Sequence, residues 1–483
     1  MRYDLEKRGT TPLYQYLYEC IRGDILKGVL PAGTRLPSKR NFAADQGIAV
    51  ITAENAYAQL LSEGYITSRS RSGFYVSEIS EGADLSLAFR QASGPISATS
   101  AESDGSTKTR SVKKQPVESF IDFTSGRLHA DAFPFSTWSK LLRRILADRE
   151  GNFLQAAPSM GIPELQEAIA AYLLQAKGLY VQPSHILIGP GTEYLHSVVL
   201  QLLGGSAITA VEDPGYKKIG QLYEGAGHKC VHIPVDEKGL RVDLLYGSNI
   251  RLLHTSPSHH FPTGCVMPVG RRYKLLAWAA TEDAYIIEDD YDSEFRFNGK
   301  PIPPLSVLDS ERVIYMNTFT KTLAPSIRIA YMVLPDALLS IYKNRLSYYS
   351  SAVSAFEQYT LAAFICEGYY ERHIARMRNF YRKERRMILD AIAASPLSEY
   401  AVIEEENAGL HFVLRLPAVS NDQTFTEKLR SEKIRLSSLS DYAYHDRPEY
   451  HHRFLISYAS LTEDELKKAL PVMVRALRSQ SRK

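Results

Sequence analysis

The chain has 483 residues, of which 45% are hydrophobic and 23% are charged, so it is long enough to bury large cores in two or more folded domains. Its formal net charge of +3 excludes binding to a polyanion through overall charge. Any contact with nucleic acid must therefore come from a local basic patch.

The first eight residues mix acidic and basic side chains and lead into no apolar core of signal-peptide length. The sequence has no run of 18 apolar residues, so we expect no membrane-spanning helix. The four cysteines are widely separated and form no metal-type or redox pair, which favours a reducing compartment. We therefore expect a cytoplasmic protein.

Three helices followed by a β-hairpin are predicted at the amino-terminal end. Apolar residues recur at helical spacing in the helices, and two short strand-like runs flank a basic turn. This order is typical of a winged helix-turn-helix, whose third helix enters the major groove of DNA while the hairpin follows the backbone. The predicted helices cover 12–27, 38–44 and 50–62, and the predicted strands cover 65–67 and 74–77.

Basic and polar side chains of this unit are placed to contact double-stranded DNA. The side chains at the start of the second helix and in the hairpin turn suit phosphates, and Thr52 and Asn55 on the third helix suit base edges. A small helical protein-interaction domain is the alternative, which the arginines of the turn disfavour. The predicted DNA contacts are Arg35, Ser38, Lys39, Arg40, Thr52, Asn55, Arg69, Arg71 and Gly73.

Four short motifs, at 33–40, 56–60, 63–66 and 72–76, make this segment resemble the DNA-binding domain of GntR-type regulators. The last of them is Ser72-Gly73-Phe74-Tyr75-Val76. The family usually has Ser-Arg at the start of the third helix, where this chain has Ala49-Val50. The resemblance implies that an arginine which normally touches DNA is missing here.

Residues 79–118 are predicted to form a flexible linker, because periodicity fades and Ser93–Lys114 is rich in Ser, Ala, Gly, Thr and charge. About 40 residues would span well over 100 Å when stretched and roughly 35 Å when relaxed. We therefore expect that the two domains it joins need not touch within one subunit.

From residue 119 to the end, short apolar strands alternate with helical patterns. This alternation predicts an α/β domain with a mainly parallel sheet and ligands at the carboxyl ends of its strands. The predicted strands include 186–188, 208–211, 252–254, 284–287 and 313–315, and the predicted helices include 165–174 and 194–203.

Polar residues follow four of these strands. Gly189–Glu193 is a glycine-rich turn before a helix, which could offer N–H groups to a phosphate. Glu288–Glu294 is an acidic cluster, which suits a carboxylate beneath a heteroaromatic nitrogen better than a metal because no histidine or cysteine is near it in sequence. Tyr216 could stack on a flat cofactor. Lys321 lies between hydroxyl residues, with Arg328 seven residues on. Taken singly, these residues could equally be a tight turn, a core tyrosine and a surface lysine.

Together they describe pyridoxal 5'-phosphate chemistry. A lysine forms the Schiff base, the ring nitrogen needs an acidic partner, and the phosphate needs N–H groups, hydroxyls and a cation. The glycine-rich turn, Tyr216, the acidic cluster and Lys321 all occur in one chain, each after a predicted strand. This favours one cofactor site over four unrelated features.

Residues 119–483 resemble the fold-type I aminotransferases, and the whole chain resembles the MocR/GabR subfamily of GntR regulators. The resemblance implies a homodimer with sites at its interface, and the linker would allow a domain-swapped arrangement. It implies that Lys321 forms the Schiff base, that Asp289 pairs with the pyridine nitrogen and that Tyr291 bonds the ring hydroxyl. It further implies ring stacking by Tyr216, phosphate contacts from Gly191, Thr192, Thr320 and Arg328, and binding of an effector carboxylate by Arg453.

Three residues depart from the family pattern. His260 stands where glutamine is usual in the segment 255–264, and Thr320 stands where serine usually precedes the lysine. Pro190 replaces the usual serine of the phosphate turn, so one hydroxyl and one N–H are lost. We expect weaker phosphate binding from this last change.

The sequence therefore predicts a DNA-binding domain in 1–78, a linker in 79–118 and an aminotransferase-like effector domain in 119–483. The favoured function is a pyridoxal phosphate-dependent transcription regulator that senses the cofactor, or an amine or amino acid that condenses with it. A catalytically active aminotransferase with a vestigial DNA-binding domain is the alternative, since Lys321 and Asp289 would also serve a transaminase half-reaction. A structural protein that binds neither ligand is disfavoured because the site residues are present. Neither a metal nor a membrane partner is expected.

Overall fold

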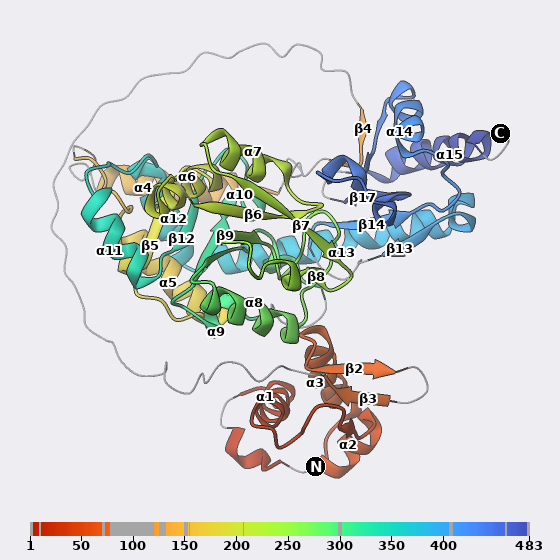
Figure 1. Ribbon diagram of the computed structural model, residues 1–483, viewed down its shortest axis with the longest axis horizontal. Coiled ribbons are helices and arrows are strands. Elements are labelled where there is room, and N and C mark those ends of the chain that lie inside the picture. The colour runs from red at the N-terminus through yellow and green to blue at the C-terminus, as the bar shows by residue number, and fades with distance from the viewer. Residues whose placement is uncertain are drawn as a thin grey trace.

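The computed structural model describes residues 3–8, 11–69, 73–77, 120–124, 132–148, 153, 155–205, 207–297, 302–404, 409–458 and 461–480 (Figure 1). The predicted linker at 79–118 and the predicted DNA contact Arg71 lie outside these residues.

The amino-terminal part is a winged helix-turn-helix, as predicted. Ser38 accepts a hydrogen bond from the Asn41 backbone N–H at the start of the second helix, and Gly47 ends that helix in the left-handed conformation. Leu17, Phe42 and Tyr57 are fully buried between the three helices. The helices are α1 (Leu13–Leu26), α2 (Lys39–Gln46) and α3 (Val50–Ser62), and the sheet has the order β1 (Arg35–Leu36), β3 (Gly73–Val76), β2 (Ile66–Arg69).

The larger part is built on an eight-stranded sheet in which β11, β10, β9, β6 and β7 run parallel. Adjacent residues of β10 face opposite sides of it: Ile286 packs in one apolar cluster with Trp278, and Ile287 packs in another with Leu195. Helices therefore cover both faces. The strand order is β5 (Ile186–Gly189), β12 (Ala330–Val333), β11 (Val313–Thr318), β10 (Tyr285–Asp289), β9 (Ile250–Thr255), β6 (Ile208–Asp213), β7 (Cys230–Asp236) and β8 (Gly239–Leu240).

A smaller sheet near the carboxyl end packs with the long helix α13 (Tyr369–Ala393) and with α15 (Glu463–Gln480) (Figure 1). Its strand order is β13 (Val402–Glu404), β14 (His411–Arg415), β17 (Arg453–Ser457), β16 (Ser437–Ser438), and β15 (Ile434–Arg435) pairs separately with β4 (Ile121–Asp122). The helices of the larger part are α4 (Phe135–Asp148), α5 (Pro163–Lys177), α6 (Thr192–Leu203), α7 (Lys217–Gly225), α8 (Val269–Thr281), α9 (Leu305–Leu308), α10 (Phe319–Thr322), α11 (Asp336–Arg345), α12 (Ala355–Cys366), α13 (Tyr369–Ala393), α14 (Asp422–Ser431) and α15 (Glu463–Gln480).

The mainly parallel sheet and all five strands named from the sequence are confirmed. The sequence did not predict β12, which runs antiparallel to both of its neighbours. The two domains also touch within this chain, since the Val269 backbone N–H donates to the Glu63 carbonyl at 2.9 Å. Across the described ranges, none of the helices is at once long enough and apolar enough to cross a bilayer.

Candidate functional site

A cavity of about 260 Å³ opens at the carboxyl ends of β6, β9, β10 and β11, where a doubly wound sheet binds its ligands. It brings together seven of the eight predicted cofactor residues, all but Gly191, which adjoins Thr192. The lining residues are Thr192, Glu193, Val211, Glu212, Gly215, Tyr216, Ile219, His254, Ser256, Phe261, Asp289, Tyr291, Thr318, Thr320, Lys321 and Arg328.

Lys321 lies in the one-turn helix α10, which begins directly at the end of β11. The Thr318 hydroxyl caps this turn by accepting from the Thr320 backbone N–H at 3.1 Å, and it donates to the Thr320 hydroxyl at 2.8 Å. Burial lowers the pKa of Lys321, against the carboxylates of Asp292 and Asp289, which raise it. A lowered pKa leaves more of the amine neutral, the form that attacks a carbonyl carbon.

Asp289 ends β10 and faces the cavity. Its Oδ2 lies 3.3 Å from Nε2 of His254 on the neighbouring strand β9. Its Oδ1 is buried and makes no hydrogen bond with any described residue. A buried carboxylate oxygen without a partner is costly, so this oxygen is the part of the site that a protonated ring nitrogen would satisfy.

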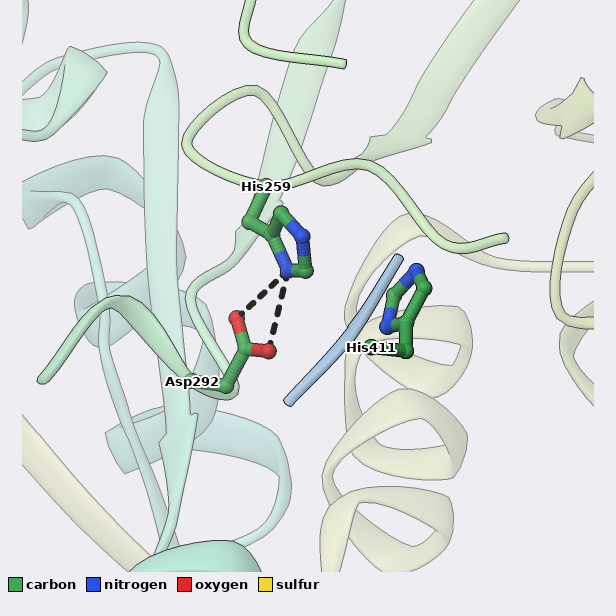
Figure 2. Close-up of side chains that lie close together, drawn as sticks. All are labelled: His259, Asp292 and His411. Atoms are coloured by element: carbon green, nitrogen blue, oxygen red, sulfur yellow. Dashed lines mark hydrogen bonds and ion pairs between the residues drawn. The ribbon is translucent and has the colours of Figure 1, made fainter. Parts of the chain in front are cut away.

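Tyr291 contacts a buried group of side chains, His259, Asp292 and His411, and Figure 2 shows these three. Its hydroxyl lies 3.2 Å from Nδ1 of His259, and that nitrogen also lies 2.9 Å from Oδ2 of Asp292. His411 comes from β14 and packs its ring 4.7 Å from that of His259. The spacing of His259, Asp292 and His411 would suit a metal ion, but Asp292 already accepts from His259 and from the Leu410 N–H. The group therefore fixes Tyr291 without needing an ion.

The opposite end of the cavity carries the predicted phosphate residues. Arg328 Nη2 donates to the Pro190 carbonyl at 3.1 Å and to Glu193 Oε2 at 2.8 Å. Gly191 has φ +102°, and a Cβ there would lie 2.3 Å from Arg328 Nη2, so only glycine admits the guanidinium. Partial burial raises the pKa of Glu193, but hydrogen bonds from Lys218 and Arg328 outweigh it and lower the pKa to about 2.

Tyr216 stands at the mouth of the cavity with 53% of its surface exposed. Its ring meets Phe261 edge to face, with centroids 6.1 Å apart. Phe261 belongs to the segment that departs from the family pattern at His260, whose Nε2 lies 3.5 Å from Glu212. The two rings are nearly perpendicular to each other and line the cavity together with Lys321 and Asp289.

The structure does not bring Arg453 to the cavity. Its guanidinium pairs with Glu404 at 2.7 Å and bonds the Glu449 carbonyl. β14 lies between β17 and β13, and the two registers place Arg453 and Glu404 on the same face of this sheet. The prediction that Arg453 holds an effector carboxylate is thus without geometric support.

The predicted DNA contacts differ in how exposed they are and in whether they already have a partner. Arg35, Ser38, Arg40 and Asn55 are exposed, although the Ser38 hydroxyl is already used to cap α2. Lys39 pairs with Glu54 at 2.6 Å, and Thr52 is half-buried. Gly73 has φ +109° and opens β3. Arg69 ends β2, and Arg71 lies outside the described residues.

Several cavity residues were not assigned from the sequence: His254, Glu193, Glu212 and Phe261. His254 is the last residue of the predicted strand 252–254, and Glu212 directly follows the predicted strand 208–211; each is the last residue but one of the observed strand. This position was their only signal. Their contacts run between different strands, so no local pattern contains them.

Two family models match the chain. Residues 118–472 match aminotransferase class I and II, and residues 13–76 match the bacterial regulatory proteins of the gntR family.

Similar proteins share both parts. The chain is 34% identical over 462 residues to the uncharacterized HTH-type transcriptional regulator YdeL of Bacillus subtilis, covering 95% of each chain. It is 34% identical to the probable rhizopine catabolism regulatory protein MocR of Rhizobium meliloti, over 96% of this chain and 94% of that one. It is 30% identical to the pyridoxine biosynthesis transcriptional regulator PdxR of Corynebacterium glutamicum, over 89% of each.

Solved structures share the fold of the larger part. An archaeal alanine:glyoxylate aminotransferase superposes with a TM-score of 0.66 at 24% identity, covering 75% of this chain and 91% of that chain. The kynurenine aminotransferase of Pyrococcus horikoshii gives a TM-score of 0.64 at 23% identity, with the same coverage.

Proposed function

Because this chain belongs to the MocR/GabR subfamily of GntR transcription regulators, we propose that its aminotransferase-like domain binds pyridoxal 5'-phosphate and senses that cofactor or an amino compound condensing with it. The protein is a DNA-binding transcription regulator, and its relatives favour this function over an aminotransferase with a vestigial DNA-binding domain. We assign DNA binding to residues 1–78, the linker to 79–118 and the effector domain to 119–483.

The observation that carries the cofactor proposal is the buried Oδ1 of Asp289, which has no hydrogen-bond partner in the described part of the chain and lies near a lysine of lowered pKa. The Asp289 carboxylate would hold a protonated pyridine nitrogen, and the Lys321 amine in its neutral form would be the nucleophile toward the aldehyde carbon. When bound, the cofactor would supply an electron sink. The chain's own residues hold and orient it.

The remaining cofactor residues are suited to opposite ends of a flat, phosphorylated ring. Arg328, Thr320, Thr192 and the Gly191 turn offer a cation, hydroxyls and backbone N–H groups to a phosphate. Tyr291, held by His259, presents a hydroxyl to the cavity wall. The half-exposed Tyr216 ring at the mouth of the cavity is suited to stack on one face of the cofactor ring.

The regulatory partners follow from the two domains. We propose that double-stranded DNA binds the winged helix-turn-helix, and that two copies of the chain act as a homodimer on two half-sites. A cytoplasmic location accords with this function.

The cofactor proposal is tested by visible absorption. Purified protein incubated with pyridoxal phosphate should gain the absorbance of an imine between the aldehyde and Lys321 Nζ, and Lys321→Ala should lack it. Lys343→Ala, an exposed lysine of α11, serves as the control and should match the wild type. A colourless wild type would overturn the proposal.

A further inference from the structure

The end of α3 is docked on the start of α8 (Figure 1). The Val269 N–H donates to the Glu63 carbonyl at 2.9 Å. Gly64, with φ +79°, lies so close to Pro268 that a Cβ on it would come within 2.7 Å of the proline Cβ. We call these four residues, with Tyr273, the docking contact.

Apolar burial supports the docking contact. Val269 is 4% exposed and belongs to the hydrophobic core of the winged helix-turn-helix, and Tyr273 packs against the same core. Tyr273 lies beside Tyr65, whose hydroxyl accepts from Arg22 Nε at 3.0 Å. Two residues of the larger domain thus complete the core of the smaller one.

Arg272 sits on the same turn of α8 and is 2% exposed. Its guanidinium donates to three carbonyls, those of Pro257 at 2.9 Å, Met267 at 3.0 Å and Pro303 at 3.0 Å. It also lies close enough to Glu63 to oppose the rise in that carboxyl's pKa that burial causes. Arg272 therefore faces the docking contact on one side and the loop 256–267 on the other.

The loop 256–267 lines the ligand cavity. Ser256 and Phe261 both face the cavity, and the Ser256 N–H donates to Glu212 Oε2 at 3.0 Å. The Pro257 carbonyl accepts from the Met267 N–H at 2.9 Å as well as from Arg272, so a ligand that shifts this carbonyl disturbs its bond to Arg272. A continuous set of contacts thus runs from the cavity wall to Glu63, which directly follows α3, the helix expected to enter the DNA groove.

We propose that Arg272 couples the cavity to the docking contact, so that ligand occupancy changes how firmly the DNA-binding domain is held against α8. This inference rests on the proposed function for its ligands, whereas the docking itself does not depend on them. The coupling is reciprocal, so DNA must change the affinity for the cavity ligand by the same factor.

Docking is tested first, by hydrogen–deuterium exchange of the full-length protein without ligands. The peptide spanning 265–273 should be protected in the wild type and exchange at least tenfold faster in Val269→Asp. This variant changes no residue of the DNA-binding domain's own segment, and an aspartate in the first turn of α8 suits the helix. Gly64→Ala should also lose protection. Gly28→Ala is its matched control, because Gly28 has a similar φ of +73° but nothing within 4 Å of the added Cβ. Equal exchange in all four proteins would refute the docking.

Coupling is tested by titrating pyridoxal phosphate with and without DNA from upstream of the protein's own gene. The two dissociation constants should differ at least fivefold in the wild type and Gly28→Ala, and less than twofold in Val269→Asp. Arg272→Lys keeps the charge but loses the forked donors, so it should keep the docking protection and lose the coupling. The proposal would be overturned if the ratio of the two dissociation constants were near one in the wild type, or if Arg272→Lys left that ratio unchanged. Absence of any cofactor absorbance would instead refute the proposed function and leave the exchange result to decide the docking.

Discussion

His254 Nε2 lies 3.3 Å from Oδ2 of Asp289, while Oδ1 of the same carboxylate is buried without a partner among the described residues. The histidine engages one oxygen and so fixes the plane of the carboxylate. The other oxygen, Oδ1, is left to accept a hydrogen bond from one further donor.

This arrangement predicts the effect of Asp289→Asn. The amide keeps the shape but loses the charge that stabilises a protonated ring nitrogen, and hydrogen bonds to charged groups contribute about 1.5–3 kcal/mol. We expect the affinity for pyridoxal phosphate to fall at least tenfold in an absorbance titration. Asp243→Asn, a mostly exposed aspartate paired with Arg241, should bind as the wild type does. An unchanged affinity in Asp289→Asn would contradict the assigned role.

Replacing Glu193 should change the affinity for pyridoxal phosphate in the opposite direction. Its carboxylate pairs with Arg328 and Lys218 at the phosphate end, and its pKa of about 2 keeps it ionised at neutral pH. It therefore competes with a phosphate for Arg328. Glu193→Gln should tighten pyridoxal phosphate binding about two- to fivefold, the range of a partly exposed ion pair. Weaker binding would show that Glu193 supports the phosphate site.

DNA binding should distinguish Arg40 from its neighbour Lys39. Arg40 is exposed, whereas Lys39 is paired with Glu54 at 2.6 Å, which offsets its charge. Arg40→Ala should weaken binding in a gel-shift assay about three- to tenfold and reduce the salt slope by about one. Lys39→Ala should have the smaller effect, and the reverse order would mean that the ion pair opens on DNA.

The buried carboxyl group of Glu288 should make the free energy of unfolding depend on pH. Burial raises its pKa from 4.5 to about 7, and Asp290 adds to this while Arg272 opposes it. The folded protein thus retains a proton that the unfolded chain releases, so this residue lowers stability as pH rises from 4.5 to 7. The loss is on the order of 3 kcal/mol. Denaturant unfolding at pH 5 and pH 7.5 should show a smaller drop in Glu288→Gln than in the wild type. Equal drops would exclude Glu288 as the cause.

The sequence by itself determined the two domain types and most of the cavity. Ser38 and Gly47 bound α2 through local backbone chemistry, and Lys321 and Asp289 each adjoin the end of a strand that apolar residues mark. Parallel strands bring their carboxyl ends to one edge. Residues placed at those ends could therefore be assigned to one site before any contact was known.

Only the tertiary structure decided which side chains are paired. Arg453 faces Glu404 because of the register between β14 and its neighbours, and Arg328 meets Glu193 across 135 positions of sequence. The contact of Glu63 with Val269 joins two domains that the linker prediction left apart. Such pairs depend on how helices and strands pack in space, and the hydrophobic periodicity of the sequence does not predict that packing.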